Sequence, residues 1–242
     1  MFGSLLRRNK VDTAEYRHEF KAAITTADPE LVKCYIDTHS FLFRDLYPDR
    51  WVNSIYFDTY ALEALDDNEL GSALRHKLRL RWYGPLEKIT GPILEVKIKK
   101  GIANRKIKES LPRFSHDLKA DPISWSDFME KMKSGLSPEA IYNFEQFTTP
   151  VLLCRYRRSY YQSACKRVRL TVDQNIQFFD QRFADGPDLA TEVDTSGRVV
   201  VEFKFENEDE ELTSEVFQQF PFLLTKSSKY RDGYGYLNRS FL

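Results

Sequence analysis

Charged and apolar residues alternate strictly along several short segments of the chain. In Leu74–Tyr83, Lys77, Arg79 and Arg81 occupy one set of alternate positions and leucines occupy the other. The same alternation recurs in four further segments: Arg17–Lys21, Ile93–Lys100, Lys166–Asp173 and Val199–Phe205. Because successive side chains of a strand point to opposite faces, each segment is predicted to be a strand with one charged and one apolar face.

Helix and turn signals separate these strands. Asp28-Pro29-Glu30 predicts a helix start with Asp28 as the cap. Short helices are also predicted in residues 60–72, in residues 122–145 with a break at Ser137-Pro138, and before Gln219. Further strands are predicted over residues 50–59, 104–109 and 151–163. About eight strands with inserted and appended helices predict an α+β fold built on an eight-stranded antiparallel β-barrel.

The predicted organisation is one domain. Residues 1–12 are expected to form a flexible lead. Residues 13–242 are expected to form a single domain with a helical insertion at about residues 120–146. The start of the chain lacks an apolar stretch long enough for a signal peptide, and no apolar run approaches the ~20 residues that span a bilayer. The three cysteines form no CxxC pair, which is typical of reduced thiols. We therefore expect a cytoplasmic protein.

The balance of charge changes the interpretation of the strands. The chain has 36 Lys and Arg residues and 36 Asp and Glu residues, so its net charge indicates no partner. On the alternating faces, however, basic residues far outnumber acidic ones. Like charges side by side repel, which favours a cationic interior that binds a polyanion. The alternative, which the pattern leaves open, is a β-sandwich whose charged faces are solvated.

Eight short motifs occur in an order that resembles a known family. They are Glu19-x-Lys21, Ser54–Thr59, Lys77-x-Arg79-x-Arg81-Trp82-Tyr83-Gly84, Leu94–Lys97, Tyr156-x-Arg158, Val168–Asp173, Glu202-Phe203-Lys204 and Ser228-Lys229-Tyr230. Together they resemble the VTC domain, the polyphosphate-polymerase domain of the triphosphate tunnel metalloenzymes. The resemblance covers about Tyr16 to Tyr236.

The resemblance implies an eight-stranded tunnel that binds triphosphate lengthwise. It also implies an ATP-dependent polyphosphate polymerase that uses Mn²⁺ or Mg²⁺. The implied catalytic phosphate ligands are Lys21, Arg79, Arg81, Lys97, Arg158, Arg169 and Lys229. The implied substrate-binding residues are Lys77, Tyr156, Lys204 and Ser228. Glu202 is the implied main metal ligand, with Glu19 as a second metal ligand.

One departure from the wider superfamily favours polymerisation over hydrolysis. Triphosphate hydrolases of that superfamily usually carry two glutamates before the lysine of the first strand, whereas Arg17 stands at the first of these positions. Two alternatives stay open: a metal-dependent triphosphatase, and a non-catalytic module that binds polyphosphate or inositol phosphates. The expected partners are a nucleoside triphosphate and polyphosphate, not nucleic acid. The sequence predicts neither a membrane partner nor an oligomeric state.

Several residues near these motifs are interpreted as structural. Asp58 is expected to act as a turn or cap residue, and Trp82 and Tyr83 are expected to pack on the outside of the barrel. The apolar residues of the C-terminal tail are expected to dock it onto the barrel, so that Ser228 and Lys229 lie over a tunnel mouth. These docking residues are Phe220, Phe222, Leu223 and Leu224.

Overall fold

The computed structural model describes residues 18–24, 28–101, 103–195, 197–206 and 209–239. The predictions for residues 1–12 and for Arg17 lie outside this part of the chain. The strands are β1 (His18–Ile24), β2 (Arg44–Asp58), β3 (Leu74–Tyr83), β4 (Lys88–Thr90), β5 (Ile93–Lys100), β6 (Ala103–Ser110), β7 (Ser115–Asp117), β8 (Thr149–Gln162), β9 (Val168–Asp180), β10 (Glu192–Asp194) and β11 (Val199–Phe205). The helices are α1 (Pro29–Asp37), α2 (Glu63–Leu70), α3 (Trp125–Lys133), α4 (Pro138–Gln146), α5 (Glu210–Gln218) and α6 (Lys229–Arg239).

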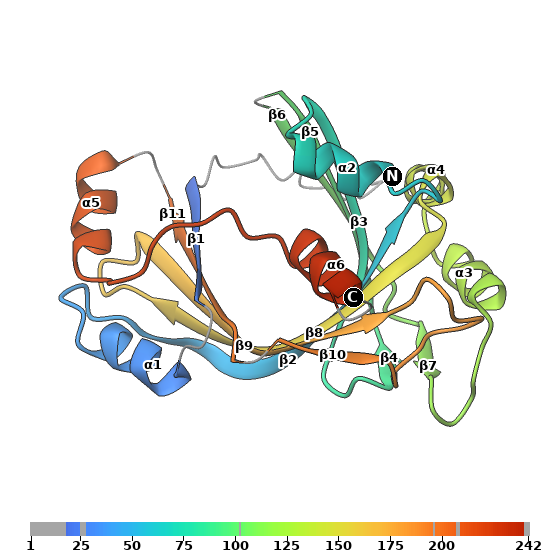
Figure 1. Ribbon diagram of the computed structural model, residues 1–242, viewed down its shortest axis with the longest axis horizontal. Coiled ribbons are helices and arrows are strands. Elements are labelled where there is room, and N and C mark those ends of the chain that lie inside the picture. The colour runs from blue at the N-terminus through green and yellow to red at the C-terminus, as the bar shows by residue number, and fades with distance from the viewer. Residues whose placement is uncertain (1–17, 25–27, 102, 196, 207–208, 240–242) are drawn as a thin grey trace, which may run out of the picture.

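One large antiparallel sheet organises the molecule. Its strand order is β1-β11-β9-β8-β2-β3-β5-β6, and β10 pairs with β9 beside this path. The sheet is strongly curved, with β1 and β11 on one side, β3, β5 and β6 on the other, and α6 within the curve (Figure 1). A separate two-stranded sheet pairs β4 with β7. The mixed α+β class is therefore confirmed.

The prediction of a closed eight-stranded barrel is wrong. The sheet has nine strands, and among the described residues β1 and β6 do not pair with each other. The C-terminal tail occupies part of the β1 edge instead. The Thr225 backbone N–H donates to the Lys21 carbonyl at 2.7 Å, and the Thr225 hydroxyl accepts from the Ala23 N–H at 3.0 Å. This tail segment satisfies backbone groups that a closing strand would otherwise use.

The helical insertion covers the outer face of the sheet. Ser124 and Ser137 cap α3 and α4 with their side chains, so the predicted break at Ser137-Pro138 is confirmed. Phe128 and Phe144 of these helices are fully buried in one cluster with Trp82 of β3. The apolar face of β3 therefore packs against the insertion. The opposite, charged face of β3 points toward the concave side of the sheet.

The tail after α5 docks only in part as predicted. Phe220 is buried against His39 and Phe203, and Phe222 packs on Tyr35. Leu223 is 86% exposed and Leu224 is 45% exposed, so the prediction that they anchor the tail is wrong. The main anchor of the tail is the helix α6.

Helix α6 contacts β8 and β9 closely because it carries a glycine where it crosses them. A Cβ at Gly233 would lie 2.5 Å from Leu152 Cδ2 and 2.7 Å from Phe178 Cδ1. Any side chain at this position would therefore push the helix away from the sheet. The close contact fixes the position of the first residue of α6, Lys229.

No helix within the described ranges is both long and apolar enough to cross a membrane.

Candidate functional site

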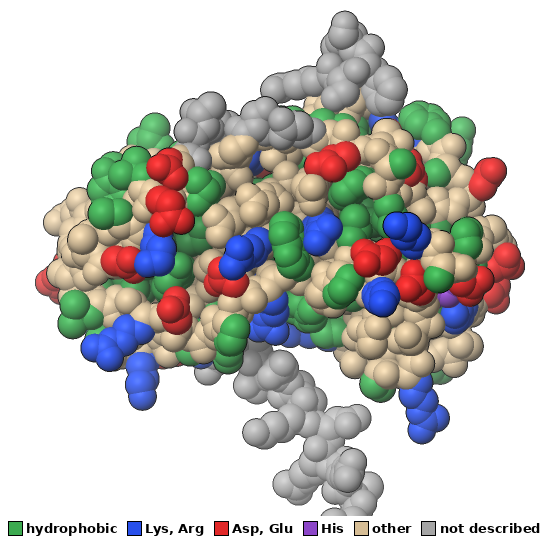
Figure 2. Space-filling model, turned by 90° about the horizontal axis from the view of Figure 1, so that it is seen from below, with side chains coloured by type: hydrophobic (Ala, Val, Ile, Leu, Met, Phe, Trp, Pro, Cys, Tyr) green, Lys and Arg blue, Asp and Glu red, His purple; other side chains and the backbone are tan. Residues whose placement is uncertain are grey.

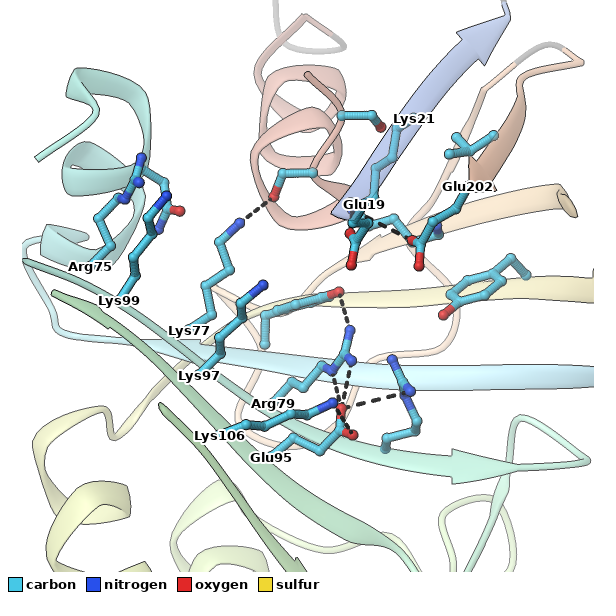
Figure 3. Close-up of a pocket in the computed structure, with 18 of the residues that line it drawn as sticks. Glu19, Lys21, Arg75, Lys77, Arg79, Glu95, Lys97, Lys99, Lys106 and Glu202 are labelled. Atoms are coloured by element: carbon cyan, nitrogen blue, oxygen red, sulfur yellow. Dashed lines mark hydrogen bonds and ion pairs between the residues drawn. The ribbon is translucent and has the colours of Figure 1, made fainter. Parts of the chain in front are cut away.

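A cavity of about 510 Å³ lies on the concave side of the sheet (Figure 3). Eleven Lys and Arg residues line it together with only three glutamates: Lys21, Arg75, Lys77, Arg79, Arg81, Lys97, Lys99, Lys106, Arg158, Lys204, Lys229, and Glu19, Glu95 and Glu202. On the outer face of the molecule shown in Figure 2, by contrast, positive and negative side chains are interspersed. Although the chain is neutral, the lining of this cavity is strongly cationic. The solvated-sandwich alternative does not describe these faces.

All but one of the site residues predicted from the sequence line the cavity. The exception is Arg169, which pairs in register with Lys204 and whose Nε is buried without a hydrogen-bond partner among the described residues. The lining also includes eight residues that are not among the predicted site residues: Tyr56, Asn68, Arg75, Glu95, Lys99, Lys106, Val200 and Ser227. Arg75 and Lys99 share the alternation of Lys77 and Lys97, so the same pattern could have found them.

Glu95 holds three cations of the cavity in place. Arg79 Nε donates to Glu95 Oε2 at 2.6 Å, while Lys106 and Arg81 lie 3.3 Å and 3.7 Å from the carboxylate. Burial alone would raise the pKa of Glu95, but Arg79, Arg81 and Lys106 lower it to about 2. Glu95 therefore remains ionised at neutral pH, and the guanidinium forks keep a fixed geometry suited to phosphate oxygens.

Asp173 is a fully buried carboxylate that joins β8 to the tail. Arg158 donates to both of its oxygens, at 2.5 Å and 2.7 Å, and Lys229 donates to Oδ2 as well. Burial would raise the pKa of Asp173, but Arg158 and Lys229 together lower it. Because Lys229 is part of this buried ion pair, a Lys229→Ala variant would lose stability as well as a cation.

A network of tyrosines positions the start of α6. The Tyr230 hydroxyl donates to Asp58 Oδ2 at 2.6 Å, and its ring stacks on Tyr56 at 5.3 Å. Asp58 also accepts from the backbone N–H groups of Ala64 and Leu65 at the start of α2. The interpretation of Asp58 as a cap residue is therefore confirmed. The Tyr56 hydroxyl in turn accepts from Arg79 at 3.3 Å, which links α6 to the cavity cations.

Lys77 lies in the cavity without a carboxylate partner among the described residues. Its ammonium donates to the Ser228 hydroxyl at 2.9 Å. Burial lowers the pKa of Lys77 to about 8, and the nearby Lys21, Lys97 and Arg79 contribute to this shift. At physiological pH the free site therefore holds a lysine close to its titration point. A bound anion would favour its charged form.

Affinity for inorganic tripolyphosphate should therefore fall as pH rises from 7 to 9, since binding above about pH 8 requires Lys77 to take up a proton. Lys77→Met should bind more weakly at pH 7 and show a flatter pH profile in titration calorimetry. The exposed Lys88→Met serves as the matched control and should follow the parent. Parallel profiles for the parent and Lys77→Met would contradict this assignment. Protonation of tripolyphosphate itself affects the parent and Lys77→Met equally, so it does not contribute to the difference between their profiles.

Glu19 and Glu202 are the carboxylates that could hold a divalent metal. They lie on the neighbouring strands β1 and β11 and face the same space (Figure 3). Lys21 lies 2.8 Å from Glu19 and 3.6 Å from Glu202, and Lys204 lies 2.5 Å from Glu202. Burial would raise the pKa of Glu202, but Lys204, Lys21 and Arg158 keep it well below its usual range.

This donor set fits a hard cation only in part. The described residues contain no group of three or more His, Cys, Asp or Glu side chains that could hold a metal. Two ionised carboxylates in a cationic cavity match a Mg²⁺ or Mn²⁺ ion that takes its remaining ligands from phosphate oxygens and water. The geometry is therefore compatible with a metal that binds together with the substrate.

Comparisons with known proteins agree with the motif order. The family model of the VTC domain matches residues 16–238. No curated protein matches the chain. Similar solved structures include the PH1819 protein from Pyrococcus horikoshii OT3, with a TM-score of 0.47, 14% identity, and coverage of 94% of this chain and 100% of that chain. A second is a putative adenylyl cyclase from Hippeastrum with a dominant triphosphatase activity, with a TM-score of 0.48, 14% identity, and coverage of 88% and 93%. Since the family model spans nearly the whole sequence, the chain belongs to the VTC domain family.

Proposed function

We propose that the protein is a polyphosphate polymerase, which transfers the terminal phosphoryl group of a nucleoside triphosphate, ATP for example, onto a growing polyphosphate chain. The observation that carries this proposal is the excess of eleven cations over three carboxylates in one cavity of a neutral chain. Membership of the VTC domain family supports it. Phosphoryl transfer requires mainly positioning and charge stabilisation, which fixed cations supply.

The cavity residues would have different roles in phosphate binding and metal binding, according to their positions. Arg79, Arg81 and Arg158 would hold and orient the donor phosphates, because carboxylates fix their guanidinium groups. Lys229 and Ser228 would contact phosphate from the tail. Glu202 and Glu19 would hold Mn²⁺ or Mg²⁺. The metal would neutralise the charge that develops on the transferred group.

The length of the cationic face favours a polymer as the acceptor. Arg81 and Arg75 are six residues apart on β3, which corresponds to about 20 Å of extended strand. Lys97, Lys99 and Lys106 continue the face on β5 and β6. A single triphosphate does not fill a face of this length. An acceptor chain lying end to end with the donor would fill it.

Incubation with ATP and Mn²⁺, followed by a gel stained for long polyphosphate and by measurement of free phosphate, tests the proposal. Polyphosphate that grows with time is expected. Phosphate release without a polymer would instead identify a triphosphatase. Tight binding of polyphosphate without any metal-dependent turnover would identify a binding module. Either of these last two results would overturn the polymerase assignment.

A further inference from the structure

A cluster of tyrosines around an arginine lies at one end of the cationic face. Tyr83 follows Arg79 and Arg81 at alternate positions of β3, and Tyr160 follows Arg158 at an alternate position of β8. Both tyrosines therefore belong to the face of the sheet that lines the cavity. The expectation that Tyr83 packs on the outside of the barrel is wrong, whereas its neighbour Trp82 is fully buried under the insertion.

Arg50 organises this cluster. Its guanidinium carbon lies 4.9 Å from the ring centre of Tyr83, 4.8 Å from that of Tyr160 and 5.7 Å from that of Tyr47. In register, Arg50 pairs directly with Arg158, a cavity residue. Within the described part of the chain, Arg50 forms no ion pair with a carboxylate, unlike Arg79 and Arg158. Arg50 is exposed and also hydrogen-bonds to Tyr160, and its guanidinium lies against the aromatic rings.

The aromatic surface of the cluster remains accessible. Tyr47 is 52% exposed and Tyr83 is 39% exposed, and the Tyr47 ring meets that of Tyr160 edge-on at 5.7 Å. A purely structural role for these residues would favour burial of the rings. Instead, rigid ring faces beside the exposed Arg50 guanidinium form a platform on which a flat, electron-rich ring can stack.

The two ends of the cationic face thus differ in chemistry. At one end, cations from neighbouring strands, Arg75, Lys97 and Lys99, line the cavity and suit a phosphate chain of any length. The other end carries tyrosines beside Arg50. A nucleoside triphosphate has the same polarity, because an aromatic base lies at one end and the phosphates lie at the other. Tyr83 and Arg79 are four residues apart, about 13 Å along β3, which leaves room for a ribose and the first phosphates.

We propose that Tyr83, Tyr160 and Arg50 form a stacking site for the base of the nucleoside triphosphate donor. This inference rests on the proposed function and adds a direction to it. The donor lies with its base at the tyrosine end and its phosphates along Arg81, Arg158 and Arg79. The polyphosphate chain extends toward Arg75, Lys97 and Lys99. Because every base has a stacking face, the site accepts purine nucleotides without selecting one of them.

Titration calorimetry on the metal-free protein with two probes, ATP and inorganic tripolyphosphate, tests the site. Tyr83→Leu removes the ring and should weaken ATP binding about tenfold. Its affinity for tripolyphosphate should change by less than about twofold, which also reports that the cavity is folded. Tyr83→Phe restores the ring and should recover ATP affinity. Tyr160→Leu should repeat the selective loss, and the exposed Tyr142→Leu on α4 is the matched control.

The outcomes separate this inference from the proposed function. If Tyr83→Leu and Tyr160→Leu both bind ATP and tripolyphosphate as tightly as the parent does, the stacking site is overturned while the cationic cavity stands. If both probes weaken equally in the variants, the tyrosines support the fold of the cavity and do not bind the base. A parent protein that binds neither probe would overturn both proposals.

Discussion

Replacement of Glu202 by Gln should lower metal-dependent turnover of ATP by at least about a hundredfold, or about 2.7 kcal/mol of transition-state stabilisation. Glu202 is 7% exposed and is one of the two cavity carboxylates that we propose as metal ligands. The glutamine keeps the shape of the side chain but lacks the charge that a divalent cation requires. Turnover should be measured at saturating Mn²⁺.

A second measurement separates loss of the metal from loss of the fold. Glu202 also neutralises Lys21 and Lys204, so its replacement makes the cavity more cationic. Metal-free binding of tripolyphosphate should therefore stay as tight as in the parent, or become tighter, while turnover falls. Glu215→Gln, on the exposed side of α5, is the control and should behave as the parent. Near-normal turnover of Glu202→Gln at saturating Mn²⁺ would remove Glu202 from the metal site.

Gly233→Ala should destabilise the protein and reduce its activity, although alanine favours a helix more than glycine does. The added Cβ would meet Leu152 and Phe178 at distances that real Cβ atoms do not adopt. Overpacking of this kind costs about 1–3 kcal/mol, against a gain of about 1 kcal/mol in helix propensity. The displaced helix would also shift Lys229 away from Asp173.

Gly235→Ala provides the matched control in the same helix. A Cβ at Gly235 would have no atom within 4 Å, so this variant keeps only the propensity gain and should be more stable than the parent by about 0.5–1 kcal/mol. The difference between the two variants in urea unfolding isolates the contact with the sheet. Equal shifts in the two unfolding midpoints would show that α6 does not rest closely on β8 and β9.

The strands and the cationic cavity could be predicted because alternation is a local signal. β3, β5 and β11 have the predicted bounds, and their charged positions meet in one cavity. The three-residue strands β4, β7 and β10 are too short to show a period, and the sequence did not reveal them. The bulged start of β2 was missed because its register shifts before Arg50 and breaks the alternation.

The parts of the fold that depend on distant contacts could not be predicted. Two glycines in the α6 segment argue locally against a helix, yet Gly233 is required there by the side chains of Leu152 and Phe178. Closure of the sheet depends in the same way on what covers the edge of β1. The segment at Thr225, about 200 residues away in the sequence, occupies part of that edge.

The carboxylates that pair with the cavity cations have a consequence for how fast the proposed product would leave. A pocket of unopposed cations would bind polyphosphate with each of its charges and release it slowly. Here Arg79 is paired with Glu95, and Arg158 and Lys229 are paired with Asp173. An incoming phosphate must therefore compete with an internal carboxylate for each of these three cations. This competition limits the net affinity of each contact while the cations stay in place. Under the proposed function, a long polyanion would advance by exchanging one weak contact at a time.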